Sequence, residues 1–295
     1  MRVFVTGATG FVGLAVVEEL LEAGHQVLGL CRSEEKAEVL AAAGAEVCRG
    51  SLEDPACLRE AAAAADGVVH LAFNHDFSRF AESCEHDRRV IELLGSALEG
   101  SARPLVVTSG VLVAQAGQGR PAAESDAPLG VDIVPRAASE EAAAAVAANG
   151  GNVSIVRLSQ VHDPVRYGLV SYAIGMYRDK GACAYVGDGL NAISAVHVRD
   201  AARLYRLALE KAEPGACYHA VAEEGVPMKA IVETIGRHLQ LPVRSVAPGE
   251  AGDFFGWLAT MIGRDGAASS ARTRQALGWR PAGPGLLADL ERGRF

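Results

Sequence analysis

The residues best suited to chemistry lie at the start of the chain, in the run Thr6-Gly7-Ala8-Thr9-Gly10-Phe11-Val12-Gly13. An apolar strand precedes this run, and a segment with helical period follows it. Glycines permit a tight turn, while free N–H groups and the helix dipole attract phosphate. The run therefore predicts a dinucleotide site, with Gly13 where the helix packs on the strand. A glycine-rich turn without a ligand is the alternative, which the strand and helix context disfavours.

A second candidate contact follows the expected strand at 26–31, where the chain reads Arg32-Ser33. A site that prefers NAD usually has an acid here for the ribose hydroxyls, but the first acid in this chain is Glu34. An Arg fork beside a hydroxyl suits a 2′-phosphate, so NADP(H) is the predicted cofactor and NAD(H) is less favoured. A solvated loop arginine is the alternative.

The spacing Thr6-Gly7-x-x-Gly10-x-x-Gly13 resembles the Thr-Gly-x-x-Gly-x-x-Gly loop of the extended short-chain dehydrogenase/reductases. The resemblance continues at Asp66-Gly67-Val68-Val69-His70-Leu71-Ala72 and at Leu277-Gly278-Trp279-Arg280-Pro281, so it covers nearly the whole chain. It implies that Ser51-Leu52 lies near the adenine, with Ser51 in place of the family's acid. Leu71, Ala72 and Phe73 complete the predicted cofactor contacts, and His70 is interpreted as a core residue.

The resemblance fails at the catalytic residues. In the family, a Ser or Thr follows strand five and a Tyr-x-x-Ser-Lys signature opens the next helix, where Lys lowers the pKa of the proton-transferring Tyr. Here Arg136 stands at the Tyr position and Glu140 at the Lys position. Arginine stays protonated, so it cannot donate a proton as Tyr does. The pair is predicted to be absent, as in the atypical branch of the superfamily, whose members range from reductases to cofactor sensors.

Three residues are predicted to replace that machinery. His162 and Asp163 occupy the Tyr-Gly positions of the family's Tyr-Gly-Pro turn, which lies beside the nicotinamide. Histidine shuttles protons near neutral pH, so His162 is the predicted proton donor, although a turn histidine that only lines the pocket is the alternative. Arg136 is predicted to anchor substrate or bind an oxyanion, and Ser109 to supply a hydroxyl. His75 or a bound water is next in line as the donor.

Composition argues against several other functions. The net charge of −8 makes nucleic acid and anionic membranes unexpected partners. No leader precedes the first strand and no run of about 18 apolar residues occurs, so a cytoplasmic location is expected. The six cysteines include no C-x-x-C pair, which predicts scattered, buried thiols in a reducing compartment. No metal site is predicted.

Alternating strands and helices predict an α/β fold with a doubly wound parallel sheet, the Rossmann arrangement, and a smaller C-terminal substrate-binding domain. Residues 1–160, with 192–222 returning to them, form the expected NADP(H)-binding domain, and 161–295 form the substrate-binding region. The helices expected near 87–98 and 136–149 correspond to the pair that forms a four-helix dimer interface in many members of the family that the chain resembles, so the resemblance implies a homodimer. The alanines of the second helix would permit close approach. The alternative is that these alanines face only the chain's own sheet.

The predicted function is that of an atypical NADP(H)-dependent oxidoreductase that reduces a small carbonyl or imine-like molecule. Two alternatives stay open. One is a non-catalytic NADP(H) sensor that controls a protein partner. The other is a sugar-nucleotide epimerase or dehydratase, whose acid–base residues we do not locate in the sequence. Oxidation of NADPH over a panel of carbonyls and imines separates a reductase from a sensor.

Overall fold

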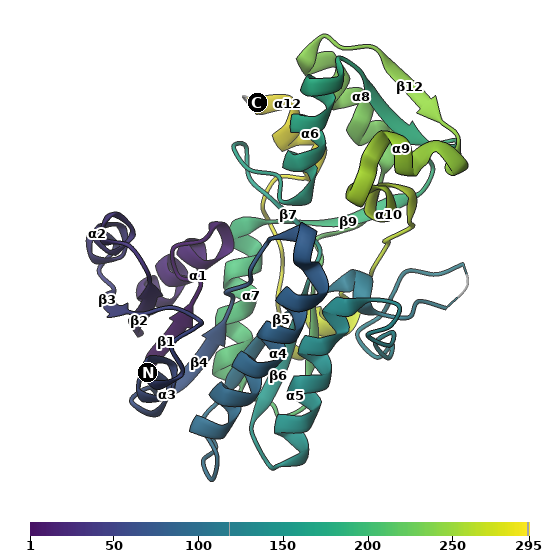
Figure 1. Ribbon diagram of the computed structural model, residues 1–295. Coiled ribbons are helices and arrows are strands. Elements are labelled where there is room, and N and C mark those ends of the chain that lie inside the picture. Colours follow the sequence, from purple (N-terminus) through teal and green to yellow (C-terminus); the bar gives the residue numbers. More distant parts are fainter. Residues whose placement is uncertain (118, 294) are drawn as a thin grey trace.

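A computed structural model describes residues 1–117, 119–293 and 295. In this part of the chain, seven strands form one parallel sheet in the order β10-β6-β5-β4-β1-β2-β3 (Figure 1). The strands are β1 (Arg2–Thr6), β2 (Gln26–Cys31), β3 (Glu46–Arg49), β4 (Gly67–His70), β5 (Leu105–Gly110), β6 (Val153–Leu158) and β10 (Cys217–Ala220). This is the doubly wound sheet that the alternation of strands and helices predicts.

Helices cover both faces of this sheet. The first face carries α1 (Phe11–Glu22), α2 (Glu34–Ala43) and α7 (Val198–Lys211), and the second carries α3 (Pro55–Ala63), α4 (Phe80–Ala97) and α5 (Ala138–Ala148). Strand β1 shows why both faces are filled: Val3 and Val5 belong to the first core and Phe4 to the second, and all three are fully buried. A parallel sheet covered on both faces requires such a continuous apolar run.

A separate apolar core lies in the C-terminal part of the chain, at the top of Figure 1. Its helices are α6 (Leu169–Lys180), α8 (Met228–Leu239), α9 (Ala251–Phe255), α10 (Ala259–Gly263) and α12 (Leu286–Arg292). It takes residues from β8 (Cys183–Val186), β9 (Ala192–His197), β11 (Glu223–Pro227) and β12 (Val243–Val246), whereas Val161 of β7 (Gln160–His162) belongs to the core of α1 and α7. They pair as β11-β9-β7 and as β12-β8. The division at residue 160 stays a prediction.

One C-terminal segment packs on the main sheet instead. Helix α11 (Ala271–Leu277) leads to Trp279, which is 1% exposed and belongs to the core of α1 and α7. Its indole Nε1–H donates to the carbonyl of Asp200, at 3.0 Å. A buried indole usually needs such an acceptor, so Trp279 packs rather than contacts a ligand.

The cysteines differ from the expectation of scattered, buried thiols. All six are free, but Cys48, Cys57 and Cys217 are only half-buried. The Sγ atoms of Cys48 and Cys57 lie 3.3 Å apart, because β3 and α3 bring them together. Burial and the neighbouring Cys57 raise the pKa of Cys48 to about 12, which keeps that sulfur protonated.

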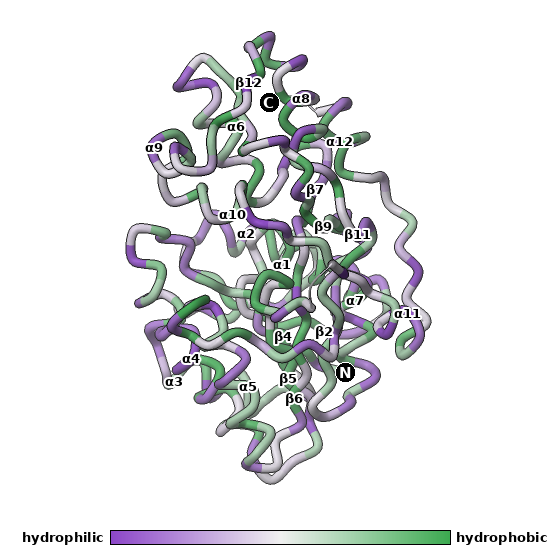
Figure 2. Tube along the Cα trace, turned by 90° about the vertical axis from the view of Figure 1, so that its right-hand side faces the viewer, coloured by the Kyte–Doolittle hydropathy of each residue, from purple (hydrophilic) through white to green (hydrophobic). Residues whose placement is uncertain are grey.

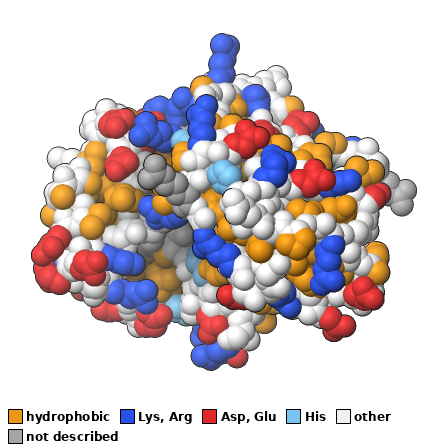
Figure 3. Space-filling view, turned by 90° about the horizontal axis from the view of Figure 1, so that it is seen from above, with side chains coloured by type: hydrophobic (Ala, Val, Ile, Leu, Met, Phe, Trp, Pro, Cys, Tyr) orange, Lys and Arg blue, Asp and Glu red, His pale blue; other side chains and the backbone are white. Residues whose placement is uncertain are grey.

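Hydrophobic residues gather in the central strands and inner helix faces, as Figure 2 shows. The face seen from above in Figure 3 carries acidic, basic and apolar side chains intermixed. Among the helices of the described residues, none combines the length and the apolar composition needed to cross a bilayer.

Candidate cofactor and active site

The glycine loop joins β1 to α1 and packs against the end of β4. Gly7 has φ +68°, and a Cβ placed on it would lie 2.7 Å from the backbone nitrogen of Ala72. A Cβ on Gly13 would lie 1.9 Å from the carbonyl oxygen of Gly7. Both distances are far inside van der Waals contact, so the turn requires glycine at these two positions. Gly13 thus closes the helix onto the turn, as the spacing predicts.

The N-terminus of α1 offers free hydrogen-bond donors. Gly10 is the N-cap and provides no side-chain cap, and its own N–H donates to the Gly7 carbonyl at 2.8 Å. In the described chain, the backbone N–H groups of Phe11, Val12 and Gly13 have no hydrogen-bond partner. Unpaired N–H groups at the positive end of a helix fit a pyrophosphate. We call residues 7–13 the phosphate cradle.

Arg32 and Ser33 follow β2. Arg32 is exposed, and its guanidinium forms no ion pair with any residue that the structure describes. Ser33 caps α2, because its Oγ accepts the Lys36 N–H at 3.4 Å. Arg49 on the neighbouring strand is already paired with Glu34 at 2.5 Å. Arg32 is therefore available to a ligand at this edge, as is the exposed Lys36 in the first turn of α2, and the contact of Arg32 with a 2′-phosphate stays a prediction.

The remaining predicted cofactor residues follow β3 and β4. Ser51 Oγ accepts the Glu53 N–H at 3.2 Å, and Leu52 is half-buried against the second core. The N–H groups of Leu71 and Ala72 both donate to Thr6 Oγ1 at 3.2 Å. These two bonds hold the end of β4 against the phosphate cradle. The structure thus brings Leu71, Ala72 and the glycines together, which is the arrangement the predicted contacts require.

Arg136 lies in a short 3₁₀ turn, η3 (Pro135–Ala137), and is tied to the protein. Its Nη1 donates to Asp87 Oδ2 at 2.6 Å and to Ser139 Oγ, and its Nη2 donates to the Thr108 carbonyl at 2.9 Å. Guanidinium has five N–H groups, so Nε–H and one Nη2–H remain for a ligand. Because Asp87 neutralises the positive charge, an anion gains less from Arg136 than from a free arginine.

Asp87 connects Arg136 with the phosphate cradle. His70 Nε2 lies 3.0 Å from Asp87 Oδ1, and His70 Nδ1 lies 2.7 Å from Thr6 Oγ1. Burial alone would raise the pKa of Asp87, but Arg136 and His70 outweigh it and hold that pKa well below its ordinary range. Both ring nitrogens of His70 are satisfied and the residue is 1% exposed, in agreement with its interpretation as a core histidine.

Glu140, at the Lys position, is also paired inside the protein. Arg157 donates to its two carboxylate oxygens from Nε at 2.8 Å and from Nη2 at 2.7 Å. Ser109 Oγ donates to Glu140 Oε1 at 2.7 Å. All three side chains are buried. The acceptor of Ser109 is therefore an internal carboxylate, and its predicted contact with substrate stays a prediction.

His162 ends β7 and is fully buried. Its Nδ1 lies 2.7 Å from Asp289 Oδ2, while its Nε2 and Asp289 Oδ1 have no partner among the described residues. Burial lowers the pKa of His162, and the opposing effect of Asp289 is smaller. Asp163 instead caps the following turn, so it does not orient the imidazole. The predicted proton donor is thus a neutral, enclosed imidazole that makes no contact with Arg136 or Ser109 in the described structure.

Aromatic side chains connect the loop after β4 with the C-terminal elements. The rings of Phe77 and Trp257 stack with centroids 4.1 Å apart, and Tyr172 of α6 lies edge-on to both, at 5.6 and 5.4 Å. At the other end of the loop, the Arg136 Cζ lies 4.2 Å from the Phe73 centroid, and Phe73 is edge-on to His75 at 5.3 Å. We call this set the aromatic wall; its rings are those of Phe73, His75, Phe77, Tyr172 and Trp257.

His75 is the histidine of this wall. Part of its ring is exposed, and desolvation of the rest together with the charge of Arg136 lowers its pKa. Asp76, the next residue, caps the 3₁₀ turn η1 (Phe77–Arg79) by accepting the Ser78 N–H at 3.1 Å. Asp76 therefore has a capping role, and His75 remains available to a ligand.

The sequence interpretation missed Asp87 and Asp289. Each is buried and accepts a hydrogen bond from a side chain singled out by the sequence. The signal for Asp87 was present, because it occupies the buried face of an amphipathic helix, where a carboxylate requires a partner. Asp289 gives a comparable signal, because it lies with Leu286 and Leu290 on the buried face of α12.

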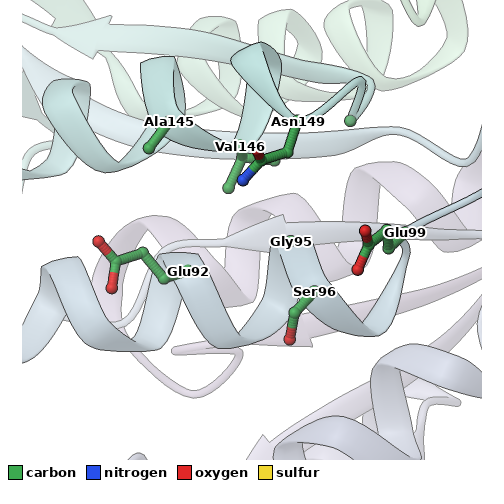
Figure 4. Close-up of a pocket in the computed structure, with 8 residues that line it drawn as sticks. Glu92, Gly95, Ser96, Glu99, Ala145, Val146 and Asn149 are labelled. Atoms are coloured by element: carbon green, nitrogen blue, oxygen red, sulfur yellow. The ribbon is translucent and has the colours of Figure 1, made fainter.

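A groove of about 280 Å³ lies elsewhere, between α4 and α5 (Figure 4). Glu92 and Ser96 of α4 border it on one side together with Glu99, which follows the helix, and Val146 of α5 and its C-cap Asn149 border it on the other. A Cβ on Gly95 would lie 2.4 Å from Val146, so glycine permits the close crossing of the two helices. None of the predicted site residues lines this groove.

Comparison with known proteins gives a family. The sequence profile of the NAD dependent epimerase/dehydratase family matches residues 3–222. An uncharacterized protein of Schizosaccharomyces pombe is 45% identical over 98% of both chains. A 3-diazoavenalumate denitrifying reductase from Streptomyces is 31% identical over 99% of this chain and 100% of its own. A dTDP-glucose 4,6-dehydratase from Streptomyces venezuelae, solved with NAD, superposes with a TM-score of 0.79 at 21% identity, covering 99% and 95% of the two chains; this likeness concerns the fold.

Proposed function

The chain belongs to the NAD-dependent epimerase/dehydratase family, and from this premise we propose that it is an NADP(H)-dependent oxidoreductase. Its substrate is a small, planar carbonyl or imine-like molecule. The observation that carries the proposal is the open phosphate cradle, with unpaired N–H groups on α1, beside the free Arg32 cation at the end of β2. When bound, the nicotinamide supplies the hydride.

The start of α5 supports a reaction without the Tyr–Lys pair. Arg136 and Glu140 are each held by a buried partner of opposite charge, so both side chains are already engaged inside the protein. We propose that the two spare N–H groups of Arg136 bind the substrate oxygen. Their charge is partly cancelled by Asp87, so this contact orients the substrate more than it attracts it.

His75 is the proton donor in this proposal, ahead of His162. His75 lies beside Phe73, which is stacked on Arg136, and part of its ring is exposed, whereas His162 is enclosed. The acid is the protonated imidazole, so the rate of reduction should rise as the pH falls toward the lowered pKa of His75.

The aromatic wall supports a planar substrate. Trp257 is 48% exposed and Tyr172 is 45% exposed, although both are large rings that folding usually covers. The two rings pack edge-on to one another, and their exposed parts offer apolar surface to a flat, conjugated molecule. The related reductase that acts on 3-diazoavenalumate supports the assignment to reduction.

We further propose a cytoplasmic homodimer formed through α4 and α5. Ala144, Ala145 and Ala148 are exposed on α5 next to the groove of Figure 4 and permit close approach of a second copy. Ala142 and Ala143 are buried in the chain's own core, so only part of the alanine-rich helix is available. If light scattering at micromolar protein concentration gives the molar mass of a monomer, the dimer proposal is wrong.

The test is a titration followed by a turnover assay. NADPH and NADH are titrated into the protein by calorimetry, and their oxidation is followed over a panel of aromatic and aliphatic aldehydes, ketones and imines. We expect tighter binding of NADPH and turnover of at least one aromatic member. A preference for NADH contradicts the cofactor assignment. Binding without turnover favours the sensor, and conversion of a sugar nucleotide without net change in the cofactor favours an epimerase or dehydratase.

A further inference from the structure

Arg166 lies on the turn that connects β7 with α6 (Figure 1), and its guanidinium meets the start of α1. Its Cζ lies 4.9 Å from the centroid of the Phe11 ring, within the range of a cation–π contact. Phe11 is the first residue of α1, and its N–H is one of the unpaired donors of the phosphate cradle. A turn far along the chain thus brings a cation to the phosphate cradle.

The backbone of this turn is held from several sides. Asp163 Oδ1 accepts the N–H groups of Val165 at 2.8 Å and Arg166 at 2.6 Å, and the Asp163 N–H donates to the Arg166 carbonyl at 2.8 Å. The next residue, Tyr167, is 1% exposed and its hydroxyl donates to the Pro164 carbonyl at 2.8 Å. The Arg166 side chain is exposed on a fixed backbone, and apart from its contact with the Phe11 ring its guanidinium has no hydrogen-bond partner among the described residues.

The charges around Arg166 leave it available. In the part of the chain that the structure describes, no carboxylate lies within ion-pair distance of its guanidinium. The cradle, residues 7–13, contains no lysine or arginine and offers only N–H groups and the helix dipole, about half a positive charge. A dinucleotide pyrophosphate carries two negative charges, so a full positive charge from another segment would complete the site.

We propose that Arg166 binds the pyrophosphate of the nicotinamide cofactor and forms, with the cradle, one site built from two distant segments. This role differs from that proposed for Arg32, which concerns the 2′-phosphate that only NADP(H) carries. The proposal rests on cofactor binding, which family membership establishes, and not on the reduction reaction. Because Arg166 lies on the turn before α6, the first helix of the C-terminal core, the bound cofactor would restrain this turn.

The experiment measures affinities by calorimetry for NADPH, NADH, ADP-ribose and AMP with wild type, Arg166→Ala, Arg166→Lys and Arg32→Ala. Removal of a charge-assisted bond to phosphate weakens binding by about 10- to 100-fold. We expect this loss with Arg166→Ala for NADPH, NADH and ADP-ribose alike, no change for AMP, and an intermediate loss with Arg166→Lys. Arg32→Ala should weaken NADPH alone. Arg178→Ala, which removes an exposed cation on α6, serves as the matched control.

Three outcomes overturn the proposal. Unchanged affinity of Arg166→Ala for ADP-ribose shows that the pyrophosphate does not contact the guanidinium. A loss confined to NADPH assigns Arg166 to the 2′-phosphate, and an equal loss for AMP assigns it to the adenosine or to folding, which thermal unfolding of the variant checks. If Arg166→Ala does not fold, the affinities of Arg166→Lys are the test. The proposal then requires weaker binding of NADPH, NADH and ADP-ribose and unchanged binding of AMP. Failure of the wild type to bind any dinucleotide would instead remove the proposed function.

Discussion

The phosphate cradle and the start of α5 hold polar groups in opposite states. In the cradle, the N–H groups of Phe11, Val12 and Gly13 point from the helix end without a partner among the described residues. At the start of α5, Arg136 and Glu140 both have buried, oppositely charged partners. The first region is therefore open to a ligand, whereas the second is satisfied by the protein itself.

This difference indicates where the chemistry of this chain lies. A charged residue with a buried partner costs several kcal/mol to disturb, so it contributes to the fold before it contributes to a reaction. The paired groups at the Tyr and Lys positions thus stabilise the fold, and of them only the two spare N–H groups of Arg136 are left for the proposed contact with substrate. The groups that remain available are His75 on the loop after β4, the exposed rings of Tyr172 and Trp257, and the side chain of Arg166.

The largest effect is expected from Glu140→Lys. It places a second cation against the buried Arg157, so the free energy of unfolding should fall by about 3–5 kcal/mol. The neighbouring Glu141→Lys is a matched control, because Glu141 is exposed and its bond to Arg88 is a surface ion pair that contributes at most about 1 kcal/mol. Urea denaturation measures both. Equal losses of unfolding free energy in the two variants would show that the Glu140–Arg157 pair contributes no more to stability than the surface pair of Glu141.

The second prediction concerns Gly13→Ala. The new Cβ collides with the Gly7 carbonyl and forces the cradle apart, so affinity for either dinucleotide should fall by at least about 100-fold, or 2.7 kcal/mol. Gly175→Ala is the control: this helical glycine of α6 has open space around it, and alanine there should raise stability by about 0.5–1 kcal/mol. Calorimetry with wild-type affinity in Gly13→Ala would mean that the cradle does not hold the pyrophosphate.

The third prediction concerns Arg32→Ala, at the end of β2. Loss of a charge-assisted contact to the 2′-phosphate should cost about 1.5–3 kcal/mol for NADPH and leave NADH unchanged. Parallel titrations of the two cofactors measure this. Equal affinities for them in the wild type would place Arg32 among the solvated loop cations.

The smallest effect concerns pH and the buried His162. Burial lowers its pKa in the folded state, whereas in the unfolded chain it titrates near 6.5. Below that pH the unfolded state binds a proton that the folded state does not, so the free energy of unfolding falls as the pH drops, by up to about 1.4 kcal/mol per unit. His162→Asn should flatten this dependence between pH 7.5 and 5.5. Parallel slopes in the two proteins would assign the dependence to other groups.

The fold and the cradle were predictable because they rest on local patterns. The apolar strands and the three glycines each occupy a few neighbouring residues, and the structure places them as expected. The catalytic side was less accessible. Arg136 bonds to a residue 49 positions away and His162 to one 127 positions away, and no local period records such pairs. The alignment with the family's strand ends identified Arg136 and His162. Whether their side chains can contact a ligand depends on these distant partners.

The most direct test of this account compares His75→Gln with His162→Gln, under conditions where NADPH deuterated at the transferred position shows hydride transfer to be rate-limiting. If the proton comes from the open loop, His75→Gln lowers kcat by about 10²–10⁴-fold and leaves NADPH affinity unchanged, while His162→Gln retains most of kcat and changes stability instead. The reverse pattern, with full kcat in His75→Gln and the loss in His162→Gln, would contradict the account and return the proton donor to the enclosed histidine of β7.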